Sequence, residues 1–158
     1  MTVAALALAD AAATEALGAA LARSLGAGVI YLRGELGAGK TTLARGLLRE
    51  RGVTGPVRSP TYTLMEPYPT AAGPVFHLDL YRLADPEELH FLGVDEIAGP
   101  EALALIEWPE RGGNLLPAPD LTVELAHDGQ ARTARLAAGS ERGRAALGAV
   151  AAGGVQPG

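Results

Sequence analysis

The stretch Gly34-Glu-Leu-Gly-Ala-Gly-Lys-Thr-Thr42 decides the fold, because it fits the pattern G-x-x-x-x-G-K-[ST] of a phosphate-binding loop, or P-loop. A short apolar run bounded by glycines, residues 29–32, precedes it, and a helical pattern over residues 41–51 opens on it. A buried strand, a glycine-rich turn and a helix are the context in which such a loop holds phosphate. The sequence therefore predicts an α/β domain of the P-loop NTPase type.

Lys40 is the only lysine among 13 basic residues, so all the others are arginine. An ammonium group is compact, whereas a guanidinium is a wide planar fork, and lysine therefore suits the inside of a tight loop. We expect Lys40 to reach the β- and γ-phosphates and the Thr41 hydroxyl to bind Mg²⁺. The glycines let backbone N–H groups point inward. The candidate nucleotide-binding residues of this segment are Leu36, Gly37, Ala38, Gly39, Lys40, Thr41 and Thr42.

The bulk composition indicates one globular domain. The chain has 158 residues, of which 48% are hydrophobic and 20% charged. That length supports one buried core and is too short for two. We expect a single domain over residues 1–152 and a flexible C-terminal tail over residues 153–158. The absence of cysteine excludes disulfides, thiolate nucleophiles and thiolate metal sites.

Charge and hydropathy predict a cytoplasmic protein without a dedicated nucleic-acid surface. The formal net charge is -5 and no long basic run is present. Residues 1–26 carry no basic residue before their apolar part, and Asp10 and Glu15 interrupt it, so we predict a helix and not a signal peptide. No apolar run approaches the roughly 20 residues of a membrane span. We therefore expect a soluble protein with no membrane partner.

The remaining pattern alternates helices and strands. Asp10 is a plausible N-cap of a first helix, and Asp128-Gly129 is a hairpin turn signal. This order predicts a mainly parallel sheet with an antiparallel edge hairpin and helices on both faces. The expected elements are a helix over 11–24, a possible strand over 62–65, a strand within 74–83, a helix beginning at Asp85-Pro86, a strand over 102–107, a hairpin over 121–138 and a helix over 140–150.

A P-loop needs a second acid at the end of a neighbouring strand to hold Mg²⁺ directly or through water. Asp79 and Glu107 are the two candidates. An apolar run leads straight into Glu107, and a buried carboxylate is costly unless it meets a cation. The alternative for Glu107 is an exposed strand-end residue. For Asp79 it is a structural carboxylate that caps a nearby loop or pairs with Arg82.

Other polar residues are less specific. Thr61 lies in Ser59-Pro-Thr-Tyr-Thr63, between the P-loop helix and the Asp79 strand, where switch-type NTPases carry hydroxyls toward the γ-phosphate; an ordinary Ser-Pro turn is the alternative. The histidines show no metal-ligand spacing, and we expect structural roles for them; they are His77, His90 and His127. Trp108 directly follows Glu107 and is expected to report on bound nucleotide.

Four stretches together resemble the bacterial TsaE (YjeE) family of P-loop ATPases: GELGAGKTTLARGLL, VRSPTYTLMEPY, FHLDLYRLADPEEL and LIEWPERG. The resemblance runs from about residue 10 to residue 135. It implies a small P-loop domain that binds ATP with Mg²⁺ and hydrolyses it, slowly in isolation. It also implies an accessory role in threonylcarbamoyladenosine modification of tRNA. The expected partner is a TsaB–TsaD complex, which hydrolysis resets between turnovers, and tRNA is expected to be engaged only indirectly.

The resemblance also assigns roles residue by residue. It implies that Lys40 binds phosphate and that Thr41 and Glu107 are the Mg²⁺ ligands. Asp79 matches a functional acid that lies behind the metal or at the partner interface. Thr61 matches the switch-like loop near the γ-phosphate.

Two further positions follow from the resemblance alone. Residues 10–14 align with the edge of the adenine pocket, and Arg132 aligns with a residue near the nucleotide. Ala11 departs from the family pattern, which often has an acidic or polar residue there.

Two other classes of P-loop protein fit the sequence less well. A small-molecule kinase would add an acceptor pocket and arginines over the phosphates, but Arg45, Arg49 and Arg51 lie on or after the P-loop helix, where a solvated face is expected. A GTP-dependent switch would need the guanine-specifying motif Asn-Lys-x-Asp. Because Lys40 is the sole lysine, that motif is absent.

Overall fold

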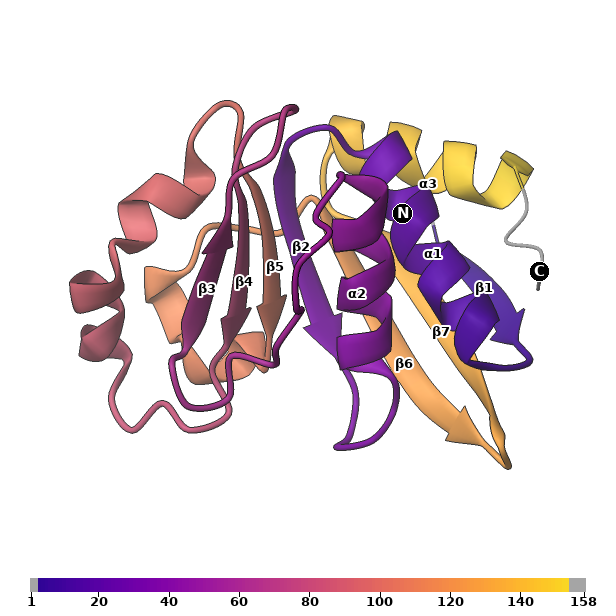
Figure 1. The fold of residues 1–158 in the computed structure, drawn as a ribbon, viewed down its shortest axis with the longest axis horizontal. Helices are drawn as coiled ribbons and strands as arrows, with labels where there is room; N and C mark the ends of the chain where they lie inside the picture. The colour runs from indigo at the N-terminus through magenta and orange to yellow at the C-terminus, as the bar shows by residue number, and fades with distance from the viewer. Residues whose placement is uncertain (1–2, 154–158) are drawn as a thin grey trace.

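The computed structural model describes residues 3–153 and contains a seven-stranded sheet in the order β1-β7-β6-β2-β5-β4-β3 (Figure 1). Gly153 is the last residue of α3, and the rest of the predicted tail lies outside the described residues. The strands are β1 Val3–Leu8, β2 Gly28–Arg33, β3 Met65–Tyr68, β4 Val75–Asp79, β5 Leu103–Glu107, β6 Leu121–Asp128 and β7 Ala131–Ala138. The helices are α1 Ala11–Ser24, α2 Lys40–Glu50 and α3 Glu141–Gly153, with 3₁₀ segments η1 Pro86–Leu92, η2 Val94–Ala98, η3 Pro109–Arg111 and η4 Gly113–Leu115.

The centre of the sheet is parallel and both edges are antiparallel. Strand β2 pairs in parallel with β5 and β6, and β4 pairs in parallel with β5. The hairpin β6–β7 extends to β1 on one edge, and β3 pairs antiparallel with β4 on the other. The predicted parallel sheet with an antiparallel edge is confirmed. Because parallel strands end at the same sheet edge, the carboxyl ends of β2, β4 and β5 meet there.

The two faces of the sheet are covered differently. In the described chain, apolar side chains of α1, α2 and α3 form one cluster with one face of the sheet. The 3₁₀ segments η1 and η2 cover β4 and β5 on the other face, where Leu89 and Ile97 are fully buried. No described helix is both long and apolar enough to cross a membrane.

Close packing of α1 against α2 fixes the position of the P-loop helix. Gly18 of α1 lies directly against the backbone of Leu43, and Gly46 of α2 lies directly against the backbone of Glu15. A Cβ atom at either glycine would overlap those backbone atoms. The two helices therefore approach at backbone distance, and Leu43 and Leu47 are fully buried between them and the sheet.

Three predicted elements were wrong in type or position. Residues 3–8 form strand β1 and not the start of a helix: alternate residues face the core, which is the period of a strand, and β1 pairs with β7. The strand predicted over 62–65 begins only at Met65, because Leu64 has a left-handed φ of 68°. The helix after Asp85 is a 3₁₀ segment, although the predicted cap is present, since the Asp85 side chain accepts from the Glu87 N–H at 3.0 Å.

Candidate functional site

The loop between β2 and α2 has the backbone shape that its glycines permit. Gly34, Gly37 and Gly39 have φ values of 152°, 80° and 108°, a region that other residues rarely adopt. A Cβ at Gly34 would also lie 2.7 Å from the carbonyl oxygen of Leu125 on β6. The loop is therefore held tightly against the sheet edge, and α2 begins directly at Lys40 with Gly39 as its N-cap.

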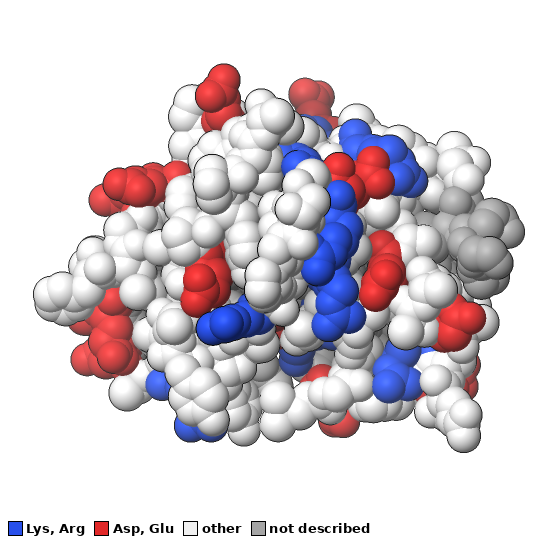
Figure 2. Space-filling view, viewed as in Figure 1, with Lys and Arg blue, Asp and Glu red and all other residues white. Residues whose placement is uncertain are grey.

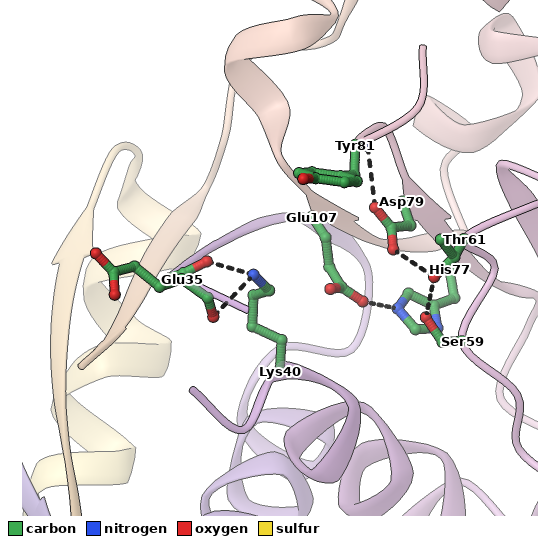
Figure 3. Close-up of polar contacts among 9 residues, drawn as sticks. Glu35, Lys40, Ser59, Thr61, His77, Asp79, Tyr81 and Glu107 are labelled. Carbon is green, nitrogen blue, oxygen red and sulfur yellow. Dashed lines mark hydrogen bonds and ion pairs between the residues drawn. The ribbon is translucent and has the colours of Figure 1, made fainter. Parts of the chain in front are cut away.

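Lys40 points back into this loop and is 6% exposed. Its Nζ donates to the carbonyl oxygen of Gly34 and, at 3.4 Å, to that of Glu35 (Figure 3). The ammonium also lies 4.3 Å from the centre of the Trp108 ring, within cation–π range. Burial lowers the pKa of Lys40, and the negative charge of Glu107 partly offsets this shift. The loop thus holds one partly desolvated positive charge at the amino end of a helix.

Asp79 and Glu107 lie side by side at the ends of β4 and β5. Their Cα positions are partners in the parallel register, and the two residues are only 5% and 2% exposed. Burial raises the pKa of Asp79, while the hydrogen bond from the Tyr81 backbone N–H opposes the shift and the charge of Glu107 adds to it. Both sequence candidates for the second acid therefore reach the same point, and neither is an exposed strand end.

The Ser-Pro loop is tied to Asp79. The Thr61 hydroxyl donates to Asp79 Oδ2 at 3.2 Å and lies 2.8 Å from the Ser59 hydroxyl (Figure 3). The Tyr81 N–H donates to Asp79 Oδ1 at 3.0 Å, so the carboxylate caps the turn after its own strand. The predicted alternative that Asp79 pairs with Arg82 is wrong, because Arg82 lies 4.6 Å from the Tyr62 ring centre instead.

These residues surround one pocket of about 230 Å³, the expected phosphate pocket. Ala38, which the sequence also predicted as a contact, is buried beneath the loop and does not line the pocket. Ser59 lines it without having been singled out from the sequence. The lining residues are Leu36, Gly37, Gly39, Lys40, Thr41, Thr42, Ser59, Thr61, Asp79, Glu107 and Trp108.

A second pocket of about 180 Å³ shares Gly39 and Thr42 with the first. Its other lining residues are Asp10, Ala11, Thr14, Gln130 and Arg132. The Arg132 guanidinium donates to the Gly37 carbonyl oxygen at 3.1 Å. The structure thus brings residues 10–14 and Arg132 together beside the P-loop, where the adenine contacts were expected.

Comparisons with known proteins show the family of this chain. A family model described as "Threonylcarbamoyl adenosine biosynthesis protein TsaE" matches residues 8–135. The tRNA threonylcarbamoyladenosine biosynthesis protein TsaE of Haemophilus influenzae is 47% identical over 116 residues, which are 73% of each chain. This chain belongs to the TsaE family.

A second relative and a solved structure extend the comparison. The Bacillus subtilis protein of the same name is 37% identical over 101 residues, which are 64% of this chain and 63% of that protein. The crystal structure of Bacillus subtilis YdiB has a TM-score of 0.78 to this fold and 25% sequence identity, with 93% of each chain covered. The TsaE match includes every residue that lines the two pockets, from Asp10 to Arg132.

The TsaE-family site offers the donor types that Mg²⁺ prefers. The Thr41 hydroxyl and the carboxylates of Asp79 and Glu107 line the phosphate pocket. Within residues 3–153, no group of three or more His, Asp or Glu side chains could form a protein-only metal cage. Mg²⁺ commonly binds through one or two protein ligands and completes its shell with phosphates and water. Two buried carboxylates beside one ammonium therefore fit a metal that arrives with a nucleotide.

One polar residue of the site was not found from the sequence. His77 is fully buried, and its Nε2 lies 2.6 Å from Glu107 Oε2 (Figure 3). The two-residue spacing of His77 and Asp79 places both on one face of β4, which the sequence does indicate. The contact with Glu107 joins side chains of two different strands, so no local sequence pattern indicates it. His90 and His127 remain outside the phosphate pocket.

Proposed function

We propose that this chain binds ATP with Mg²⁺ and hydrolyses it, slowly in isolation, as an accessory protein in tRNA threonylcarbamoyladenosine (t6A) modification. The observation that carries the proposal is the buried Lys40 ammonium in a P-loop beside the buried carboxylates of Asp79 and Glu107. Membership of the TsaE family supports the link to t6A biosynthesis.

The proposed roles follow from the chemistry of each group. Lys40 and the loop N–H groups bind the β- and γ-phosphates at the positive end of α2. Thr41 and Glu107 hold Mg²⁺, which when bound neutralises charge on the phosphate oxygens. Thr61 and Asp79 place a hydroxyl and a carboxylate beside the γ-phosphate. The hydrogen bond between these two groups ties the Ser-Pro loop to β4, and we expect the loop to respond to the γ-phosphate as the switch loops of other NTPases do.

The partner in this proposal is a TsaB–TsaD type complex in the cytoplasm, which hydrolysis resets between turnovers. The net charge and the face shown in Figure 2 support an indirect engagement of tRNA. Figure 2 shows a narrow basic stripe over α2 on one face of a chain whose net charge is -5, with acidic and uncharged side chains around it. A broad basic surface would be expected for direct binding of the tRNA backbone.

No observation favours the small-molecule kinase. Arg45 pairs with Glu15 at 3.5 Å, and Arg49 and Arg51 donate to backbone carbonyl oxygens beyond the ends of α2 and α1. None of these arginines lines the phosphate pocket. A kinase would use arginines over the phosphates, whereas here Arg45 pairs with α1 and Arg49 and Arg51 bond the backbone beyond the helix ends.

The purified chain tests the ATPase proposal directly. Calorimetric titration with ATP and GTP, with and without Mg²⁺, should give a saturable Mg²⁺-dependent signal for ATP and a weaker one for GTP. Phosphate release should be slow and should not increase when a panel of metabolites is added. Absence of nucleotide binding would remove the proposal, and rapid phosphorylation of one metabolite would replace it with the kinase.

A further inference from the structure

His77 is a polar side chain at a buried position among apolar residues. It lies in the middle of β4, fully buried, with Leu105 as its Cα partner on β5. The preceding residue on the same face, Val75, belongs to the apolar cluster beneath the α-helices. A buried imidazole costs free energy unless its nitrogens find partners. The residue therefore needs an explanation that packing alone does not give.

The only hydrogen bond of the His77 ring among the described residues goes to Glu107. Its Nε2 lies 2.6 Å from Glu107 Oε2, while Nδ1 is buried and has no partner there. An ionised carboxylate can only accept, so the hydrogen of this bond lies on Nε2, while Nδ1 meets no hydrogen-bond partner within residues 3–153. One ring nitrogen thus bonds a carboxylate oxygen, while the other stays buried without a hydrogen bond in the described part of the chain.

That bond constrains the Glu107 side chain. A glutamate side chain has three rotatable bonds, and the end of β5 fixes only its Cα and Cβ. The other carboxylate oxygen, Oε1, has no hydrogen bond within residues 3–153, while Glu107 lines the phosphate pocket with Lys40 and Thr41. Holding Oε2 from behind turns Oε1 toward that pocket. Partners that orient a metal-binding side chain in this way typically change metal affinity about 10- to 100-fold.

We infer that His77 is a positioning residue that holds Glu107 Oε2 through its Nε2–H and thereby orients the carboxylate for Mg²⁺ and the nucleotide. The inference rests on the proposed function, because it needs Glu107 to act on a metal. It goes beyond that function by giving a role to a residue of the neighbouring strand β4 that does not line the pocket.

Three substitutions at one position test the inference. His77→Gln keeps an amide N–H about where Nε2 lies, His77→Asn places its amide near Nδ1 and short of Glu107, and His77→Leu removes both. The full chain is titrated with Mg²⁺ at fixed ATP, and binding is followed by calorimetry. We expect the Gln variant to stay within about threefold of the unmodified chain, and the Asn and Leu variants to need about 10- to 100-fold more Mg²⁺.

Two controls separate orientation from general damage. ATP affinity in EDTA should change by less than about twofold in every variant that keeps its thermal unfolding midpoint, because His77 does not line the pocket. Glu107→Gln serves as the positive control for the metal. If Glu107→Gln shifts the Mg²⁺ curve and His77→Asn and His77→Leu do not, the role of His77 is wrong while the proposed ATPase stands. If Glu107→Gln shifts nothing, the metal role proposed for Glu107 fails, and the inference fails with it.

A measurement on the nucleotide-free chain needs no variant to fold. Nitrogen-15 NMR correlations of the imidazole show which ring nitrogens carry a hydrogen. The inference requires a hydrogen on Nε2 of His77, and a ring with a hydrogen on Nδ1 alone would overturn it, since Nε2 could then not donate to Glu107.

Discussion

Strands β4 and β5 carry two rungs of one ladder that differ in chemistry but not in burial. At the amino ends, Val75 faces Leu103, and both are fully buried. At the carboxyl ends, Asp79 faces Glu107, and they are 5% and 2% exposed. The first rung removes apolar surface from water, which stabilises the fold. The second buries two carboxyl groups, which opposes folding. The comparison distinguishes Val75 and Leu103, which stabilise the fold, from Asp79 and Glu107, which we expect to act on the nucleotide.

The largest expected effect is on the apolar rung. Leu103→Ala removes a fully buried side chain from the main cluster and should lower the free energy of unfolding by about 2–5 kcal/mol. Urea denaturation measures this loss. ATP affinity of the variant, measured under conditions where it remains folded, should change by less than about twofold. Much weaker ATP binding by a folded Leu103→Ala chain would show that the apolar pair also matters for nucleotide binding, which would contradict the distinction.

The next effect concerns the charge that faces the polar rung. Lys40→Ala removes the ammonium from the P-loop and should weaken ATP binding by about 100-fold or more, since charge-assisted hydrogen bonds contribute about 1.5–3 kcal/mol each. Calorimetry is the appropriate measurement, because Trp108 itself contacts Lys40 and its fluorescence would change without nucleotide. The matched control is Lys40→Arg, which keeps the charge. Full binding by the Arg variant would contradict the argument that a guanidinium does not fit the loop.

Asp79→Asn should stabilise the folded chain at pH 7, whereas most substitutions of buried residues destabilise it. The pKa of Asp79 is raised by burial, so protonation of this carboxyl is more favourable in the folded chain than in the unfolded chain. The protonated Asp79 carboxyl contributes its full stabilisation below pH about 4, the ordinary pKa of aspartate. This stabilisation is lost as the pH rises through the raised pKa of Asp79 in the folded chain. The Asn variant should therefore be more stable than the unmodified chain at pH 7, with a difference that shrinks toward pH 4, and its ATP hydrolysis should fall. Thermal unfolding across this pH range checks the sign; a less stable variant at pH 7 would show that the carboxylate serves the fold.

The smallest expected effect concerns the Ser-Pro loop. Thr61→Val removes the hydroxyl that donates to Asp79 and keeps the shape of the side chain, so ATP hydrolysis should slow by about three- to tenfold with little change in affinity. Thr63→Val is the matched control, because its hydroxyl bonds the nearby Glu66 side chain instead. Single-turnover hydrolysis measures both. Equal hydrolysis rates for the two variants would contradict a role for the Thr61 hydroxyl in ATP hydrolysis.

Local patterns predicted the parts of the fold whose signals lie within one element. The P-loop, the strand that ends in Glu107 and the hairpin over 121–138 were all placed correctly. Strand β1 was missed because Val3–Leu8 is rich in alanine and leucine, which favour helices, and its strand form depends on pairing with β7 more than a hundred residues away. The 3₁₀ segment after Asp85 shows the same limit, since its cap signal does not specify the helix type.

The sequence singled out residues that the structure brings together, but not the hydrogen bonds between them. The motif and the strand-end rule singled out Lys40, Asp79 and Glu107, because each follows from a local pattern. The bonds that join Thr61 to Asp79 and His77 to Glu107 span 18 and 30 residues, and they depend on sheet order and register. Side-chain partners at such separations arise only once the strands are paired, so no single stretch of sequence contains them.

The central claim is that this TsaE-family chain uses ATP to renew a t6A-modifying complex. The most direct measurement is t6A formation by purified TsaB and TsaD with the threonylcarbamoyl donor and tRNA, followed over many turnovers with no addition, with this chain or with its Lys40→Ala variant. The account predicts that the unmodified chain with ATP increases product beyond one turnover per complex and that the variant does not. Equal product in all three reactions would contradict it.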